Sequence, residues 1–149
     1  MKVLIRNEQK KLKTDAPQLV KLAKEVLVRL GSNDSELSLL LVDNKRIQEL
    51  NNKYLGKNSP TDVLSFPMNQ GEFGNVKSNI LGDVVLSLEK AKELADQEET
   101  PVKTIIANLL IHGILHLHGY DHERSVGDER KMNKEAKRLF GFVKDQGLV

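Results

Sequence analysis

All four histidines of this 149-residue chain fall within one 11-residue segment, at positions 112, 116, 118 and 122. His112 and His116 lie in the mainly apolar stretch 104–117, which has the length of a helix and is followed by Gly119. A separation of four residues on a helix corresponds to about 400° of rotation, so the two imidazoles lie within about 40° of each other on one face. The fold must therefore hold an apolar helix against a core while that helix carries a histidine pair.

A third imidazole can approach this pair from another direction. Gly119 breaks the predicted helix, the chain turns over the next two residues, and His122 can then come back from the side. Three neutral imidazole nitrogens on one hemisphere of an ion leave the fourth position to water, which is the arrangement of a catalytic zinc site. The sequence therefore predicts one Zn²⁺ ion bound by His112, His116 and His122, although three imidazoles also suit Ni²⁺ or Co²⁺.

The spacing H-x-x-x-H-x-x-G-x-x-H is also the ligand spacing of the metzincin proteases. Those enzymes have a general-base glutamate directly after the first histidine, where this chain has Gly113. The alternative that these histidines are ordinary core residues is preferred for His118, which lies about 200° from His116 and faces away from the pair. We expect Asp121 and Glu123 to act as turn and capping residues, with a role around the metal as the alternative.

The chain contains no cysteine, which excludes disulfides, thiol nucleophiles and thiolate metal ligands together. Its 23 Lys and Arg residues against 21 Asp and Glu residues leave a net charge of +2, so bulk charge does not identify a polyanionic partner.

The N-terminus lacks the apolar region of roughly 7–15 residues that a signal peptide needs. No stretch reaches the ~18 apolar residues of a membrane span, so we expect a soluble, cytoplasmic protein with no membrane partner.

Hydrophobic periodicity predicts strands and helices in the order βαβαββααα. The predicted strands cover 3–6, 37–41, 63–66 and 84–86, and the helices begin at Asp15, at Asp43 or Asn44, at Ser87, at Thr100 and near Gly127. This order favours an α+β fold, a small mixed sheet of about four strands packed with about five helices, in a single domain over 1–149. Met132, Ala136 and Leu139 share helical spacing, which predicts core packing rather than a methionine beneath a metal.

Three blocks of the sequence resemble the signature of the YbeY family, bacterial single-strand-specific metalloendoribonucleases that mature ribosomal RNA. The blocks are HGILHLHGYDH at 112–122, LNNKY at 50–54 with PTDVLSFP at 60–67, and LGDVV at 81–85. They occur in the family's order, and the length fits a whole family member. Together they are far more specific than the histidine block alone.

The resemblance implies zinc at His112, His116 and His122 and a zincin-like fold for one metal-dependent hydrolase domain. It also implies an endoribonuclease that acts in 16S rRNA 3′ end maturation and in ribosome quality control. The implied partners are ribosomal RNA and ribosomal or ribosome-assembly proteins. The oligomeric state does not follow from the sequence.

The chain departs from the family at Leu55, because an arginine thought to contact substrate phosphate usually follows the tyrosine of the second block. Lys57 is the candidate substrate-binding residue in its place, with Lys53 and Arg46 as other sources of positive charge; an ordinary solvated lysine is the alternative for Lys57. Two roles are open for Asp62. It caps its own loop, the commoner role for Asp there, or it is a catalytic residue that orients the water at the metal.

Hydrolysis of an RNA phosphodiester is the chemistry that this site favours. A bound Zn²⁺ polarises a phosphoryl oxygen, lowers the pKa of its water to ~7, or does both. Three other functions stay open: a metal-dependent hydrolase of another substrate (a peptide or small amide), a structural zinc module that binds a ribosomal partner, and a plain binding protein with no metal. Gly113 argues against a peptidase, and a structural module predicts a fourth protein ligand such as Asp121.

Overall fold

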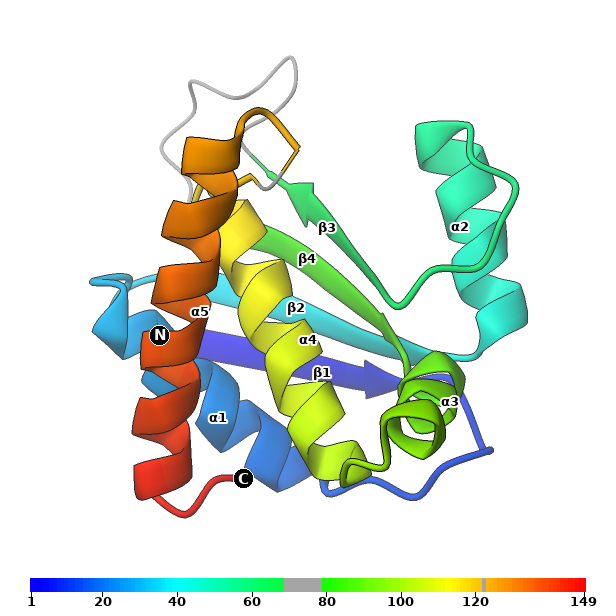
Figure 1. Ribbon diagram of the computed structural model, residues 1–149, viewed down its shortest axis with the longest axis horizontal. Coiled ribbons are helices and arrows are strands. Elements are labelled where there is room, and N and C mark those ends of the chain that lie inside the picture. Colours follow the sequence, from blue (N-terminus) through cyan, green and yellow to red (C-terminus); the bar gives the residue numbers. More distant parts are fainter. Residues whose placement is uncertain (69–78, 122) are drawn as a thin grey trace.

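The computed structural model describes residues 1–68, 79–121 and 123–149. Within them the order of elements is the one predicted from the sequence (Figure 1). The elements are β1 (Lys2–Asn7), α1 (Ala16–Arg29), β2 (Glu36–Val42), α2 (Asn44–Leu55), β3 (Val63–Pro67), β4 (Ile80–Ser87), α3 (Leu88–Glu98), α4 (Val102–Leu117) and α5 (Val126–Asp145).

The strands of the described residues form one mixed sheet in the order β1-β2-β4-β3. β1 pairs with β2 and β2 with β4 in parallel, whereas β3 pairs with β4 antiparallel. Helices α1 and α4 pack on one face of this sheet, with α5 packed against both of them, and α2 packs on the other face (Figure 1). The predicted α+β class and mixed sheet are therefore confirmed.

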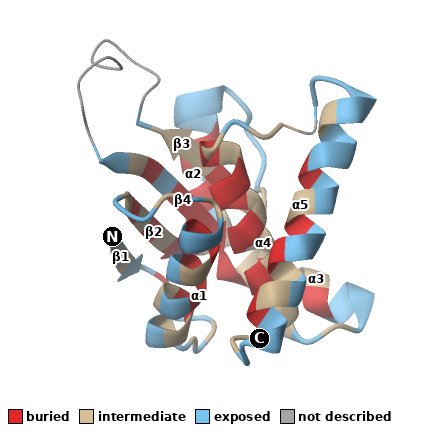
Figure 2. Ribbon diagram, turned by 90° about the vertical axis from the view of Figure 1, so that its left-hand side faces the viewer, coloured by how far each residue is buried: buried red, intermediate tan, exposed pale blue. Residues whose placement is uncertain are grey.

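The two faces of β2 belong to two separate clusters of buried side chains. Leu37, Leu39 and Leu41 point into the larger cluster beneath α1 and α4, and Val42 belongs to the smaller one beneath α2, with Leu40 packed against it. Successive side chains of a strand point to opposite faces of a sheet, so the apolar residues of β2 serve both clusters. Figure 2 shows the buried residues concentrated between the sheet and the helices.

Four of the five helices in the described residues begin at a side-chain cap, and the sequence predicts three of these caps, at Asp15, Asp43 and Ser87. Asp15, Asp43, Ser87 and Ser125 each accept a hydrogen bond from the backbone N–H three residues later. Such a bond satisfies one of the N–H groups that a helix leaves without a partner at its start. These caps explain why the predicted starts of α1, α2 and α3 agree with the structure.

Two boundaries differ from the prediction. Helix α4 has no side-chain cap, because Pro101 and not the predicted Thr100 occupies the N-cap position, and proline has no side-chain acceptor. The hydroxyl of Thr100 donates to the carbonyl of Glu98. Strand β4 begins at Ile80, four residues before the predicted start at Val84. Its first half is less apolar, and it is held in place by pairing with β2 and β3 rather than by burial.

Helix α4 is the helix that positions the histidines, and it packs against α1, α3, α5, β3 and β4. Nine of its 16 residues are buried, which matches a helix that is apolar around most of its circumference. None of the helices in the described ranges is both long and apolar enough to cross a membrane.

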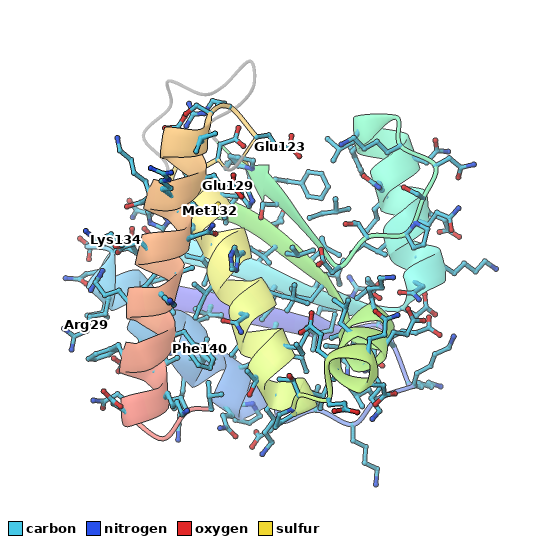
Figure 3. The ribbon with its side chains drawn as sticks, viewed as in Figure 1. Arg29, Glu123, Glu129, Met132, Lys134 and Phe140 are labelled. Atoms are coloured by element: carbon cyan, nitrogen blue, oxygen red, sulfur yellow. The ribbon has the colours of Figure 1, made fainter. Side chains whose placement is uncertain are left out.

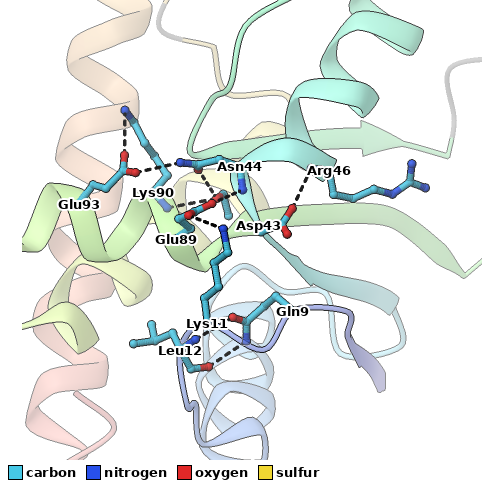
Figure 4. A network of polar contacts seen from close by, with 10 residues as sticks. Gln9, Lys11, Leu12, Asp43, Asn44, Arg46, Glu89, Lys90 and Glu93 are labelled. Atoms are coloured by element: carbon cyan, nitrogen blue, oxygen red, sulfur yellow. Dashed lines mark hydrogen bonds and ion pairs between the residues drawn. The ribbon is translucent and has the colours of Figure 1, made fainter.

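A polar network joins the loop after β1 to the starts of α2 and α3 (Figure 4). Glu89 accepts hydrogen bonds from Lys11 Nζ at 2.7 Å and from the backbone N–H of Asn44 at 3.0 Å. The hydrogen bond from Lys11, followed by that from Asn44, lowers the pKa of Glu89 below its ordinary value. The ionised carboxylate of Glu89 therefore helps to hold three segments of the chain together.

We expect Glu89→Gln to lower the free energy of unfolding at pH 7 by about 1 kcal/mol, the upper end for surface ion pairs, because the Glu89 carboxylate is half-buried and also accepts the N–H of Asn44. Because the folded-state pKa of Glu89 is lowered, its contribution is present above the unfolded-state value of ~4.3 and is lost as the pH falls through the folded-state pKa. Urea unfolding of both proteins between pH 3 and 7 measures this. Asp96→Asn, which removes the exposed pair with Lys92, is the control and should show no resolved change. An equal loss at pH 3 and pH 7 would contradict the assignment.

Candidate metal centre and adjoining cavity

His112 and His116 lie one turn apart on α4, and each is half-buried. His112 Nδ1 lies 2.7 Å from the carbonyl oxygen of Asn108, and His116 Nδ1 lies 3.0 Å from the carbonyl oxygen of Tyr120. A carbonyl oxygen only accepts hydrogen bonds, so Nδ1 of each ring carries the proton and donates it. In this tautomer the lone pair of each neutral imidazole is on Nε2.

This chemistry fits a metal ion. Histidines that bind metals nearly always donate their other ring N–H to a carboxylate, a backbone carbonyl or water, and here a carbonyl fixes both tautomers. His122 lies outside the described residues, so the structure does not place the third predicted ligand. Among the residues that are described, no group of three or more histidine or carboxylate side chains converges on one point.

The chain after α4 provides the partner of His116 through a tight turn at Gly119. Gly119 has a φ of +91°, its N–H donates to the carbonyl of His116, and the N–H of Tyr120 donates to the carbonyl of Leu115. These two hydrogen bonds define a Schellman motif, in which glycine adopts the left-handed conformation at low cost. The motif turns the carbonyl of Tyr120 back toward the His116 ring.

His118 is a structural residue, as its predicted orientation indicates. Its Nδ1 lies 2.9 Å from the carbonyl oxygen of Ile114, and its Nε2 lies 2.6 Å from the hydroxyl of Ser32. Both ring nitrogens therefore have partners within the protein. The contact with Ser32 ties the end of α4 to the turn that follows α1, away from the histidine pair.

Gly113 faces the sheet rather than the histidine pair. A Cβ atom at this position would lie 2.7 Å from Val84 Cγ1 and 3.2 Å from Val63 Cγ2. The carbonyl of Gly113 also accepts a hydrogen bond from the hydroxyl of Ser65 on β3, at 2.9 Å. Packing therefore explains why the residue after the first histidine has no side chain, and a glutamate here would be directed into the core.

A cavity of about 560 Å³ adjoins His112 between α3, α4 and α5, and Asp62 lies in its wall. Asp62 Oδ1 also accepts the N–H of Val63 at 2.8 Å, which is the local loop role. The structure thus brings Asp62 and His112 to one cavity. Lys57 is exposed in the loop after α2 and is not among the described residues that line this cavity, and Leu55 is 53% exposed at the end of α2.

Two further residues behave as the sequence predicts. Asp121 Oδ1 accepts the N–H of Glu123 at 2.8 Å, which confirms its turn role. Met132 is fully buried with Ala136 and Leu139 in the main core cluster, which confirms core packing (Figure 3 labels Met132).

Apart from Asp62 and His112, the described residues that line this cavity were not identified as site residues from the sequence. Glu98 comes from α3, and Asn133, Lys137 and Phe140 come from α5. Phe140 projects from α5 on the side that faces α4 (Figure 3). The three α5 residues are spaced i, i+4, i+7, so the pattern does place them on one face. It does not show which part of the chain this face meets.

The fold and the site together define a small α+β protein in which one apolar helix presents a pair of tautomer-fixed imidazoles beside a cavity. The chain belongs to the YbeY endoribonuclease family, because the family model described as Endoribonuclease YbeY matches residues 4–144.

Relatives and a solved structure agree with this assignment. A protein named endoribonuclease YbeY from Syntrophus aciditrophicus is 41% identical over 141 residues, which cover 94% of this chain and 88% of the relative. A second protein of the same name, from Geobacter metallireducens, is 40% identical over 150 residues, and the match covers 100% of both chains. The solution structure of a protein from Thermotoga maritima has a TM-score of 0.61 at 25% identity, and the match covers 98% of this chain and 94% of that one.

Proposed function

We propose that this chain is a zinc-dependent, single-strand-specific endoribonuclease of one domain that acts in 16S rRNA 3′ end maturation and ribosome quality control. Its partners are then ribosomal RNA and ribosomal or ribosome-assembly proteins in the cytoplasm. The observation that carries the proposal is the pair His112 and His116, whose Nδ1 atoms both contact backbone carbonyls, with His112 also lining a cavity. The names of the relatives support an endoribonuclease.

His112, His116 and His122 would hold the zinc ion. Zinc in such a site neutralises charge on a phosphoryl oxygen and lowers the pKa of water to ~7, which is what an anionic phosphodiester requires. The carbonyls of Asn108 and Tyr120 keep the ring protons on Nδ1, so that Nε2 of both residues stays the electron-pair donor. Asp62, in the wall of the same cavity, is the candidate group to hold the proton of the attacking group.

Lys57 would contact the RNA backbone from the exposed loop after α2. Leu55 occupies the position of the family's usual arginine. The ammonium group of Lys57 would therefore contact the phosphate in place of a guanidinium group, which forms two parallel hydrogen bonds to a phosphate. Binding of RNA through such cationic side chains weakens as the salt concentration rises.

The proposal is tested with one RNA oligonucleotide offered as a single strand and as a duplex with its complement. We expect the zinc-loaded protein to cleave the single strand only, and we expect a chelator to abolish cleavage until zinc is added back. Cleavage that survives the chelator, or equal cleavage of the duplex, would contradict the proposal. Cleavage of a casein-like substrate instead of RNA would indicate another hydrolase, and bound zinc without cleavage of either would indicate a structural zinc module.

A further inference from the structure

The cavity beside His112 is lined by both apolar and polar side chains. Apolar side chains come from all three surrounding helices, namely Leu94 of α3, Ile105 and Leu109 of α4, and Ala136 and Phe140 of α5. The volume of about 560 Å³ is within the ~300–1,000 Å³ typical of pockets for small ligands. A flat ligand with apolar faces would therefore find contact area here.

Hydrogen-bonding groups line the rest of this cavity. The amide side chains of Asn108 and Asn133 and the ammonium group of Lys137 all border it. An amide group both donates and accepts, so it matches the mixed donors and acceptors along the edge of a nucleobase. Apolar side chains together with two amide groups suit a nucleobase better than a sugar.

The charges of the cavity argue against a phosphate group inside it. Two carboxylates, Asp62 and Glu98, line the cavity, whereas Lys137 is the one ammonium group among its described lining residues. A phosphodiester would meet more negative than positive charge there, whereas an uncharged base would not be repelled. The phosphate would stay at the histidine end of the cavity while the attached base enters it.

We propose that this cavity is a nucleobase subsite for the nucleotide beside the cleaved phosphodiester, with Asn133 at the edge of the base and Phe140 against its face. The inference rests on the proposed function and adds a source of strand selectivity to it. Proteins that read single-stranded RNA bind unstacked bases against aromatic side chains and hydrogen-bond to their edges. A base within a duplex is stacked and paired, so it would not enter the cavity.

The test combines one substitution on the protein with one on the RNA. Asn133→Leu keeps the approximate size of an exposed side chain and removes its hydrogen bonds, so the fold should be retained. Lys134→Leu is the matched control, because Lys134 is also exposed on α5 and projects away from α4 (Figure 3). The RNA substrate is used intact and with a single abasic nucleotide on either side of the mapped cleavage site.

We expect removal of the base on one side to lower kcat/KM of the wild type and of Lys134→Leu by about tenfold, within the range found for base stacking in single-strand sites. Asn133→Leu should cleave the intact RNA about tenfold more slowly and should lose most of its response to the abasic nucleotide. Phe140→Leu, which keeps an apolar side chain but removes the ring, should behave in the same way. Zinc content should be equal in all four proteins.

A binding measurement provides a readout that does not depend on cleavage. With zinc removed, a single-stranded RNA carrying 2-aminopurine at the same position should change its fluorescence on binding to the wild type, and less so with Asn133→Leu. Equal cleavage of intact and abasic RNA by the wild type would overturn the subsite while leaving the endoribonuclease intact. An Asn133→Leu protein that matches Lys134→Leu in every assay would also overturn it. Absence of any RNA cleavage by the wild type would remove the proposed function and the subsite together.

Discussion

His112→Ala and His116→Ala are each expected to abolish stoichiometric zinc binding and RNA cleavage, whereas His118→Ala should retain both. Loss of a hydrogen-bond partner behind a metal ligand already costs about 10–100-fold in affinity or activity. Loss of the ligand itself should therefore lower zinc affinity by more than ~100-fold. Metal analysis of the purified proteins and RNA cleavage with added zinc measure the two effects.

His118 is the matched control for this experiment, because it lies on the same helix within two residues of His116. Its two ring nitrogens contact Ser32 and Ile114, so its replacement removes two hydrogen bonds within the protein. We expect His118→Ala to lower the free energy of unfolding by about 1–3 kcal/mol with zinc still bound. A loss of zinc from His118→Ala as large as that from His112→Ala would contradict the assignment of the ligands.

The parts of this structure that could be predicted from the sequence depend on contacts that are local along the chain. The pairing of His112 with His116 follows from helix geometry alone. The caps Asp15, Asp43 and Ser87 follow from hydrogen bonds to groups three residues away. For the same reason His118 could be assigned a structural role before its partner Ser32 was known.

The parts that could not be predicted depend on long-range packing. The early part of β4 has little apolar alternation, and only its pairing with β2 and β3 makes it a strand from Ile80 onward. The cavity is assembled from α3, α4, α5 and the loop before β3, so no single segment contains its pattern. Gly113 was interpreted as a missing catalytic base, and only the position of Val84 shows that packing excludes any side chain there.

Gly113→Ala is expected to destabilise the protein, whereas Gly141→Ala should stabilise it. Both glycines lie inside helices, where alanine is favoured over glycine by about 1 kcal/mol. Around Gly141 nothing lies within 4 Å of an added Cβ, so the full gain is available. At Gly113 the Cβ would lie 2.7 Å from Cγ1 of Val84, a fully buried β-branched residue with little freedom to move. We expect a net loss of about 1–3 kcal/mol there, measured by urea unfolding.

A double substitution identifies the cause of this loss. Val84→Ala removes both Cγ atoms and should itself cost about 1–3 kcal/mol through the cavity that it leaves. In that background Gly113→Ala should cost little or should stabilise, because the added methyl group occupies the vacated space. The two changes should therefore be coupled by 1 kcal/mol or more. Additive effects would show instead that the loss arises elsewhere, for example at the hydrogen bond from Ser65 to the Gly113 carbonyl. Coupling would establish that the close packing of α4 on β4 at Val84 leaves no room for a side chain at position 113, so that a glutamate there would disrupt the core before it served as a base.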